Sequence, residues 1–301
     1  MDEAKVSRFK TSVLILIGLF ILGYILAGFF STSGIKLGNV AKIKINGLIL
    51  TEDANLWTDS VTSSSDFREF IEDAEKNDAI KAILIEIDSP GGAPVASAEI
   101  ADAIRSAGKP TVALIRESGA SGAYWAASAA DKVVAHPLSI TGSIGVIGSY
   151  LQFSGLLERY NVTYERLVAG SYKDAGSPFK ELSLDERKFL QTAIDEIYYY
   201  FVASVAKNRN MTFEEVEKMA DGKFYTGMQA KKLGLVDELG GQDKAEEILK
   251  NMTNLTEIHY AEYEKKRTFF DLLAGVISQQ SFALGKGIGS GFVKEGVEVK
   301  T

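Results

Sequence analysis

Cysteine is absent from the 301 residues of the sequence. Its absence excludes disulfide bonds, thiolate metal sites and a cysteine nucleophile. Histidine is almost as scarce, because His136 and His259 are the whole complement. A mechanism that needs several imidazoles, as most zinc hydrolases do, is therefore poorly supported.

Positive charge is also in short supply. The sequence has 33 Lys and Arg against 40 Asp and Glu, a formal net charge of −7 at pH 7, and no basic block. Such a chain is not attracted to a phosphate backbone, so we expect no nucleic-acid partner. The apolar share of 46% and the charged share of 24% are ordinary for a globular protein, and the length suffices for one enzyme domain with a real core.

One long hydrophobic run stands near the amino terminus. Residues 11–35 contain no charged side chain, and residues 13–30 are apolar almost throughout. A helix of that length rises about 27 Å, close to the hydrocarbon thickness of a bilayer. A cleaved signal peptide is the alternative, although its apolar region is usually shorter. We expect a single-pass, uncleaved anchor at 11–35 in the cell membrane, with residues 1–10 cytoplasmic and the following domain outside.

Segments typical of strands and of helices alternate through the rest of the sequence. We expect strands at residues 41–45, 82–88, 111–115, 133–135, 144–147 and 162–168, and helices at 64–78, 95–107, 121–130, 184–207, 213–220, 226–233 and 243–251. Ser65 and Ser183 are the expected N-caps of the first and fourth helices. The alternation is typical of a mostly parallel sheet covered by helices, in which sites form at the carboxyl ends of strands.

Two boundaries follow from this pattern. We expect one α/β domain at residues 36–255 and a carboxyl-terminal tail at 256–301. The tail is Gly-rich and moderately apolar from residue 269 onward. Contact with a partner subunit, contact with the membrane and disorder are all open for it.

Ser121 lies in a tight turn of small residues, Gly-Ala-Ser-Gly-Ala at 119–123, before an alanine-rich helix. Small neighbours let a substrate carbonyl approach, and the N–H groups of a helix start can hold a developing oxyanion. The turn resembles a nucleophile elbow, G-x-S-x-G, except that Ala123 replaces the last glycine. The other interpretation is that Ser121 only caps the helix.

A second turn, Ser-Pro-Gly-Gly at residues 89–92, follows a buried strand. Adjacent glycines can turn their backbone N–H groups outward and bind an anion. The other interpretation is a strand-to-helix turn that needs a positive φ. The spacing of a phosphate-binding loop is absent.

A serine nucleophile needs a base. His136, beside Pro137, is one choice, although a lone histidine in such a position is more often structural. The other choice is a lysine, which must be kept neutral by burial because an unperturbed lysine, with a pKa of about 10.4, is almost wholly protonated at pH 7. Lys173 is conspicuous, since it lies in a turn-rich loop at 170–178. Spacing alone selects no one lysine.

Five blocks in order resemble the signal peptide peptidase A family, short single-repeat type. These are serine–lysine peptidases of the ClpP/crotonase superfamily. The blocks are IEIDSPGG (85–92), ESGASGAYWAASAADKVVAHP (117–137), TGSIGVIG (141–148), GSYKDAGSPFKELS (170–183) and FYTGMQAKKLGLVDELGG (224–241). The resemblance runs from about residue 43 to about residue 249 and implies an α/β fold of the ClpP/crotonase type with the peptidase domain at 36–255.

The resemblance also implies roles for single residues. Ser121 is the implied nucleophile and Lys173 the implied general base of a serine endopeptidase. Ser143, in the TGSIG block, matches a serine that hydrogen-bonds the lysine. Chemistry of this kind needs no metal, nucleotide or other cofactor.

The oxyanion hole and the partners are implied in the same way. Backbone N–H groups of Gly91 or Gly92 and of Gly122 would hold the oxyanion. Short members of the family form ring-like homo-oligomers, in which the serine and lysine of one site come from neighbouring subunits. The expected substrates are signal peptides left in the membrane after processing and other apolar peptides.

Three other functions are compatible with parts of the sequence. One is a related membrane-bound serine protease that acts on a stomatin-like membrane partner. Another is an acyl-CoA enzyme of the crotonase fold, which needs neither an anchor nor Ser121. The third is an inactive scaffold of the same fold that binds apolar peptides, against which the presence of both Ser121 and Lys173 argues.

Overall fold

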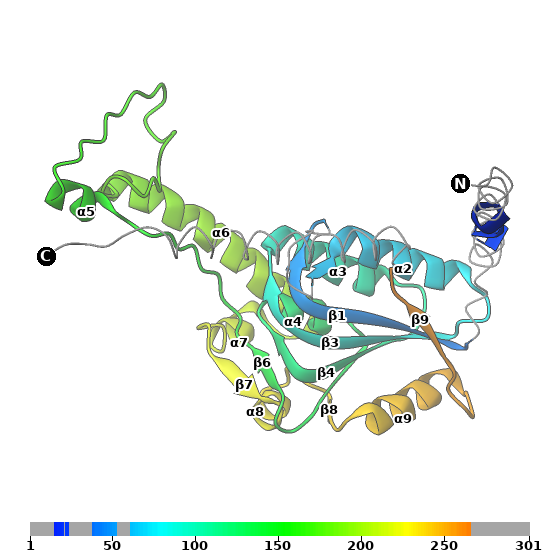
Figure 1. Ribbon diagram of the computed structural model, residues 1–301. Coiled ribbons are helices and arrows are strands. Elements are labelled where there is room, and N and C mark those ends of the chain that lie inside the picture. Colours follow the sequence, from blue (N-terminus) through cyan, green and yellow to red (C-terminus); the bar gives the residue numbers. More distant parts are fainter. Residues whose placement is uncertain (1–14, 21, 24–37, 53–60, 266–301) are drawn as a thin grey trace, which may run out of the picture.

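A computed structural model describes residues 15–20, 22–23, 38–52 and 61–265 (Figure 1). Of the expected anchor at 11–35, residues 15–20 and 22–23 are helical, and the remainder lies outside the described residues. Within the described ranges, no helix is both long and apolar enough to cross a membrane. The expected cytoplasmic tail at 1–10 and residues 266–301 also lie outside the described residues.

A sheet of nine strands in the described part of the chain forms the centre of the molecule. Its strands are β1 (Val40–Leu50), β2 (Val61–Ser63), β3 (Ala82–Gly92), β4 (Thr111–Ala120), β5 (Lys132–Ala135), β6 (Ile140–Gly142), β7 (Phe224–Thr226), β8 (Glu238–Leu239) and β9 (Tyr260–Tyr263). The main order is β2-β1-β3-β4-β5-β8, all parallel. β6 runs parallel to β4, and β7 alone is antiparallel, to β6. The expected mostly parallel sheet is confirmed.

Helices cover both faces of this sheet (Figure 1). Their bounds are α2 (Ser64–Lys76), α3 (Pro94–Ser106), α4 (Gly122–Ser128), α5 (Ser154–Arg159), α6 (Leu184–Arg209), α7 (Phe213–Glu217), α8 (Gly227–Lys232) and α9 (Gln242–Thr253). The N-cap of α2 is Ser63, whose side chain accepts from the Asp66 amide, so the prediction of Ser65 is wrong. Ser183 caps α6 as expected, in a capping box with Glu186.

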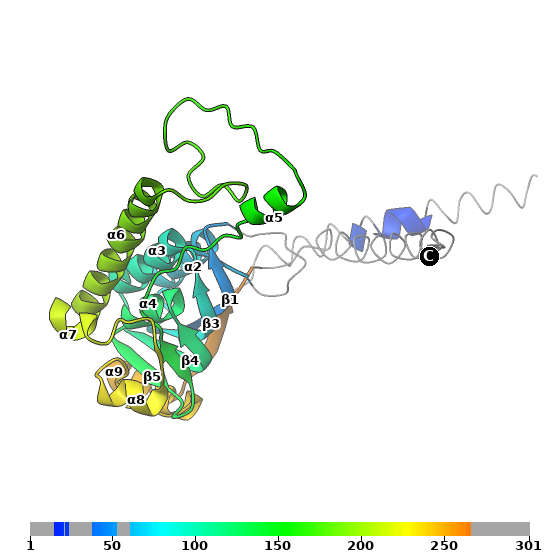
Figure 2. The same ribbon diagram turned by 90° about the vertical axis from the view of Figure 1, so that its left-hand side faces the viewer.

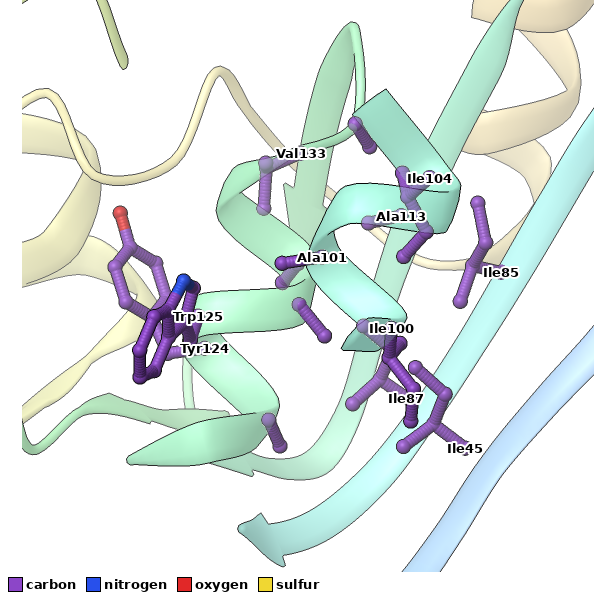
Figure 3. Close-up of a cluster of buried hydrophobic side chains, with 14 of the residues drawn as sticks. Ile45, Ile85, Ile87, Ile100, Ala101, Ile104, Ala113, Tyr124, Trp125 and Val133 are labelled. Carbon is purple, nitrogen blue, oxygen red and sulfur yellow. The ribbon is translucent and has the colours of Figure 1, made fainter. Parts of the chain in front are cut away.

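Two apolar cores hold the helices to the sheet. Side chains alternate across β3: Ile83, Ile85 and Ile87 belong to the larger core, and Ala82 and Leu84 belong to the smaller one. The larger core packs against α2, α3, α4 and α6, and Figure 3 shows isoleucines of β1 and β3 facing those of α3. The smaller core packs against α9. Successive side chains of a strand point to opposite faces of the sheet, so β3 contributes to both cores.

α6 has one half inside the molecule and one half outside it. Phe201, Val202 and Val205, near its carboxyl end, are buried in the larger core. Its amino-terminal half projects from the body, together with α5 and the irregular segment between the two helices (Figures 1 and 2). This projecting arm therefore carries α5 and the irregular segment up to residue 183 away from the sheet.

Two predicted strands are absent from this arm. Residues 144–147 and 162–168 form no strand, although both segments are rich in β-branched residues. Ile147 and Leu167 are 90% and 96% exposed. Neither segment is registered with a strand among the described residues, and β-propensity without a paired neighbour does not make a strand.

The sheet also continues past residue 255, where the pattern placed the end of the domain. Residues 260–263 form β9, which pairs in parallel with β1 from Val40 to Ile43. Ala261 and Tyr263 are buried while Glu262 between them is exposed, as in a half-buried strand. The first described part of the expected tail therefore belongs to the folded domain.

Candidate active site

Ser121 has a strained backbone. It lies between the end of β4 and the start of α4, with φ 54° and ψ −126°. Its N–H donates to the Gly142 carbonyl at 2.8 Å, and its own carbonyl accepts from the Trp125 N–H at 3.0 Å. A non-glycine residue held so costs about 1–3 kcal/mol, and such residues cluster at functional sites.

The capping interpretation of Ser121 does not agree with this geometry. An N-cap serine has an extended backbone and accepts a helix N–H with its side chain. Ser121 has a positive φ, and its side chain makes no capping hydrogen bond to α4. Its hydroxyl is therefore available for another task, and a serine on a sharp strand-to-helix turn has the geometry of a nucleophile elbow.

The three glycines expected in the oxyanion hole lie close together next to Ser121. A Cβ atom on Gly91, whose φ is 101°, would lie 2.7 Å from the Gly122 nitrogen and 3.0 Å from the Ser121 Cβ. A Cβ atom on Gly122 would lie 2.1 Å from the Ser97 Oγ and 3.3 Å from the Gly92 nitrogen. The structure thus brings backbone amides together beside the serine, in a space where no side chain fits.

Ser89 stabilises the 89–92 turn through two hydrogen bonds. Its buried hydroxyl donates to the Gly47 carbonyl at 2.6 Å and accepts the Gly91 N–H at 3.0 Å. The Gly91 amide is therefore already bonded within the turn. Sequence reasoning missed both Ser89 and Ser97, because a serine near a turn has no pattern that separates a supporting role from a solvent-facing one.

Ser143 lies beside Ser121. The last registered pair of β4 and β6 is Ala120 with Gly142, so the next residue of each chain segment is a serine. Ser143 has a φ of 51°, its N–H donates to the Lys223 carbonyl at 2.9 Å, and its hydroxyl donates to the Gly222 carbonyl at 3.3 Å.

Lys173 stands apart from these residues. Its side chain is exposed, and its N–H donates to the Gly170 carbonyl at 3.1 Å within a run of turns on the projecting arm. No hydrogen bond joins its side chain to Ser121. The structure of one chain therefore assembles the serine, the glycines and Ser143, but not the predicted base.

Contacts along α6 give a scale for this separation. The ring of Tyr172, next to Lys173, packs on Phe189 with the centroids 5.2 Å apart. Further along the same helix, Phe201 stacks on Trp125 of α4 at 4.5 Å. The rise of an α-helix puts Phe189 and Phe201 about 18 Å apart along the axis. Tyr172, next to the predicted base, and Trp125, in the helix that follows the nucleophile, therefore pack against opposite halves of α6.

The two histidines do not replace the lysine. His136 is exposed after β5, and its Nδ1 accepts the Leu138 N–H at 3.2 Å. His259 is exposed beside Glu257, with 3.5 Å between Nε2 and Oε2. In the part of the chain that the structure describes, neither imidazole hydrogen-bonds to Ser121.

The backbone of Lys223 contacts the site, because its carbonyl accepts the Ser143 N–H. Its ammonium pairs with Asp221 at 2.6 Å, and this hydrogen bond raises the pKa of Lys223 above its ordinary value. A lysine held in its charged form is a poor general base. Among the residues described, no group of three or more His, Asp or Glu could hold a metal ion.

A strained serine between a parallel strand and a helix, with glycine amides packed beside it, is the arrangement expected at the nucleophile of an α/β serine hydrolase. A comparison with protein families agrees, since the model described as "Peptidase family S49" matches residues 103–256. The chain belongs to this family, that of the signal peptide peptidase A proteins, and is a serine-type peptidase.

Curated relatives carry similar descriptions. A putative protease of Methanocaldococcus jannaschii is 37% identical over 223 residues, which cover 73% of this chain and 70% of the relative. A putative signal peptide peptidase SppA of Enterococcus faecium is 37% identical over 235 residues, or 77% of this chain and 68% of the relative. Protease 4 of Salmonella typhi is 34% identical over 243 residues, or 78% of this chain but only 38% of that longer protein.

Proposed function

We propose that this chain is a membrane-anchored serine endopeptidase that hydrolyses apolar peptides, including signal peptides left in the membrane. Ser121 is the nucleophile and Lys173 of a neighbouring copy is the general base. The observation that carries the proposal is the strained backbone of Ser121, whose hydroxyl caps no helix and lies beside three glycines. The description of one relative as a putative signal peptide peptidase supports the substrate class.

The oxyanion hole is best formed by Gly92 and Gly122. Gly91 is less suited, because its N–H already donates to Ser89. Gly122 is the first residue of α4, where a helix N–H has no partner within the helix. A carbonyl oxygen bound there would gain negative charge as Ser121 attacks, and fixed amide donors stabilise that charge.

The reaction then proceeds in two halves. The neutral amine of Lys173 takes the hydroxyl proton as the Ser121 oxygen bonds to the scissile carbonyl carbon. The C–N bond breaks, and the departing amine takes the proton from the lysine. Water then gives a proton to the same amine and attacks the acyl-enzyme, and the lysine returns that proton to Ser121 as the carboxylic acid leaves.

A second copy of the chain supplies the lysine in this proposal. The projecting arm exposes large apolar side chains, and burying them against a second copy would be favourable. They are Ile147, Leu151, Leu167 and Leu184, each more than 70% exposed. Docking the arm on a neighbouring copy would remove water from Lys173. Desolvation disfavours the ammonium form, which is what a lysine base requires. A ring-like homo-oligomer would repeat this contact.

The anchor at 11–35 gives the substrate class a physical reason. An apolar run of that length fits a bilayer, and tethering concentrates the site near peptides that partition into membranes. The orientation with a cytoplasmic amino terminus and an extracytoplasmic peptidase domain is part of the proposal. No cofactor enters it.

The proposal is tested with the full chain in detergent micelles, a fluorogenic apolar peptide and a fluorophosphonate that labels activated serines. Ser121→Ala should abolish hydrolysis and labelling, and Lys173→Ala should lower both by about three orders of magnitude or more. His136→Ala and Lys223→Ala are the matched controls and should keep most of the activity.

The other outcomes each point elsewhere. Full activity of Lys173→Ala, or loss only in His136→Ala, would move the base to the imidazole. A wild-type chain that neither hydrolyses peptides nor reacts with the fluorophosphonate would support the peptide-binding scaffold. Hydrolysis of a stomatin-like protein but of no signal peptide would favour the protease with a specific membrane partner.

A further inference from the structure

Arg166 holds the chain on both sides of Lys173. Its Nε and Nη2 atoms donate to the two carboxylate oxygens of Asp174, at 2.5 and 2.8 Å. Nη2 also donates to the Ser171 carbonyl at 3.2 Å. One guanidinium therefore hydrogen-bonds to Asp174, directly after the lysine, and to Ser171, two residues before it. Parallel bonds from an arginine to a carboxylate fix orientation as well as distance.

The Asp174 carboxylate also connects Arg166 to α6. Lys180 lies 3.6 Å from an Asp174 oxygen and bonds directly to Glu186 in the first turn of the helix. Glu186 in turn accepts the Ser183 N–H at 3.0 Å, as part of the capping box. Arg166, Asp174, Lys180 and Glu186, here called the arm network, thus join three separate segments of the arm.

Burial and charge favour a single arrangement of the arm network. The Asp174 and Glu186 side chains are only 13% and 6% exposed, although they lie on a projecting part of the molecule. The hydrogen bond from Arg166 lowers the pKa of Asp174 to about 2, and the one from Lys180 lowers the pKa of Glu186. Both carboxylates are therefore ionised at every pH at which a lysine could act as a base.

The backbone around Lys173 is bonded as well. Two turns include it, with the Lys173 N–H donating to the Gly170 carbonyl and the Ala175 N–H to the Tyr172 carbonyl, each at 3.1 Å. A third follows directly, in which the Ser177 N–H donates to the Asp174 carbonyl at 3.0 Å. The direction in which the lysine leaves the backbone is thus set by the turns and by the arm network together. An exposed loop without such bonds would let the amine sample many positions.

We propose that Asp174, held by Arg166, is a positioning residue that aims the Lys173 amine before a second copy docks. The inference rests on the proposed function, in which that amine is the general base. An amine displaced by about 1 Å costs about 100-fold in rate. Because the lysine acts in the chemical step and binds no substrate, the loss should fall on kcat and not on KM.

The test measures kcat, KM and the rate of fluorophosphonate labelling for the full chain in detergent. Asp174→Asn should lower kcat and labelling about 10- to 100-fold with KM within about twofold of the wild-type value. Arg166→Lys keeps the positive charge but loses the forked geometry of the guanidinium. Its kcat and labelling rate should therefore lie between those of the wild type and those of Asp174→Asn. Lys244→Gln removes a more exposed ion pair on α9, with Glu247 at 2.7 Å, and should leave all three quantities unchanged.

A double-variant comparison separates positioning from a structural effect. In a Lys173→Ala background, Asp174→Asn should not slow the residual labelling further, because no amine remains to be aimed. An equal loss in both backgrounds, a loss confined to KM, or a change in oligomeric mass by light scattering would overturn the positioning role. So would wild-type kcat in both Asp174→Asn and Arg166→Lys.

The two levels of the proposal fail in different ways. If Lys173→Ala hydrolyses peptides like the wild type, the lysine is not the base and the proposed function is wrong. If Lys173→Ala is inactive while both network variants keep full kcat, the base is correct and only the positioning role is wrong.

Discussion

Ser121 and Ser143 occupy the same position at the ends of two paired parallel strands. Each follows directly on a residue of the last registered pair, Ala120 with Gly142, and each has a positive φ, 54° and 51°. A non-glycine residue in that conformation is uncommon. Two of them side by side mark the ends of β4 and β6 as strained, as backbone at functional sites often is.

This relationship predicts a role for the Ser143 hydroxyl. Ser143→Ala and Ser143→Gly both remove it, but only glycine accepts the positive φ without strain. If the hydroxyl orients the lysine, both variants should lower kcat by a similar factor, about 10-fold. If only the backbone matters, Ser143→Gly should match the wild type in peptide hydrolysis while Ser143→Ala alone loses activity.

The space beside Gly122 gives a second prediction. Gly122→Ala would place its Cβ 2.1 Å from the Ser97 Oγ and 2.9 Å from the Ser97 Cβ. Overpacking of this kind costs about 1–3 kcal/mol, so the melting temperature and the labelling of Ser121 should both fall. Adding Ser97→Gly should restore part of the melting temperature. A Gly122→Ala chain as stable as the wild type would contradict this packing.

The partly buried ion pair of Arg209 and Asp237 gives a third prediction. Asp237 accepts from Arg209 at 2.9 Å and from the Val133 N–H at 2.7 Å, and so joins the end of α6 to β5. Burial opposes the ionised form, but these partners together lower the pKa of Asp237. Asp237→Ala leaves Arg209 without its partner, which should cost about 3 kcal/mol in chemical denaturation. A loss below that of the exposed-pair control Lys244→Gln would be inconsistent with this account.

The arm network predicts a dependence of stability on pH. The hydrogen bond from Arg166 lowers the pKa of Asp174 from 3.8 to about 2 in the folded chain. Because the folded pKa lies below the unfolded one, the carboxylate stabilises the fold above about pH 4, and this contribution is lost as the pH falls toward 2. Thermal unfolding should therefore depend more steeply on pH in the wild type than in Asp174→Asn between about pH 5 and pH 2. Parallel curves would show that the charge is not stabilising.

The α/β core could be predicted because its information is local. A short, continuous apolar run such as 82–88 indicates a buried strand by its own composition, and Ser183 with Glu186 specifies a helix start. The strand at 140–142 could not be predicted from its own residues. It forms there, and not in the more apolar segment at 144–147, because β4 and β7 pair with it. The strand at 260–263 likewise depends on β1, more than 200 residues earlier.

The site divides in the same way. Small residues around Ser121 are a local signal for a tight turn, and the turn is where they indicate. That Gly91 is already bonded to Ser89 depends on the packing of β3 on β1 and is invisible in the sequence. The pairing of Arg166 with Asp174 lies in an irregular segment without periodicity. The spacing of residues in the sequence also does not reveal that Lys173 lies on the projecting arm, away from Ser121 of the same chain.

The central claim is that one active site takes its serine and its amine from two copies. Ser121→Ala and Lys173→Ala chains, each inactive alone, are co-expressed with different affinity tags, and mixed oligomers carrying both tags are purified. The account predicts that these oligomers regain hydrolysis of the fluorogenic peptide, because an intact serine of one copy meets an intact lysine of another. Mixed oligomers as inactive as either parent would contradict it.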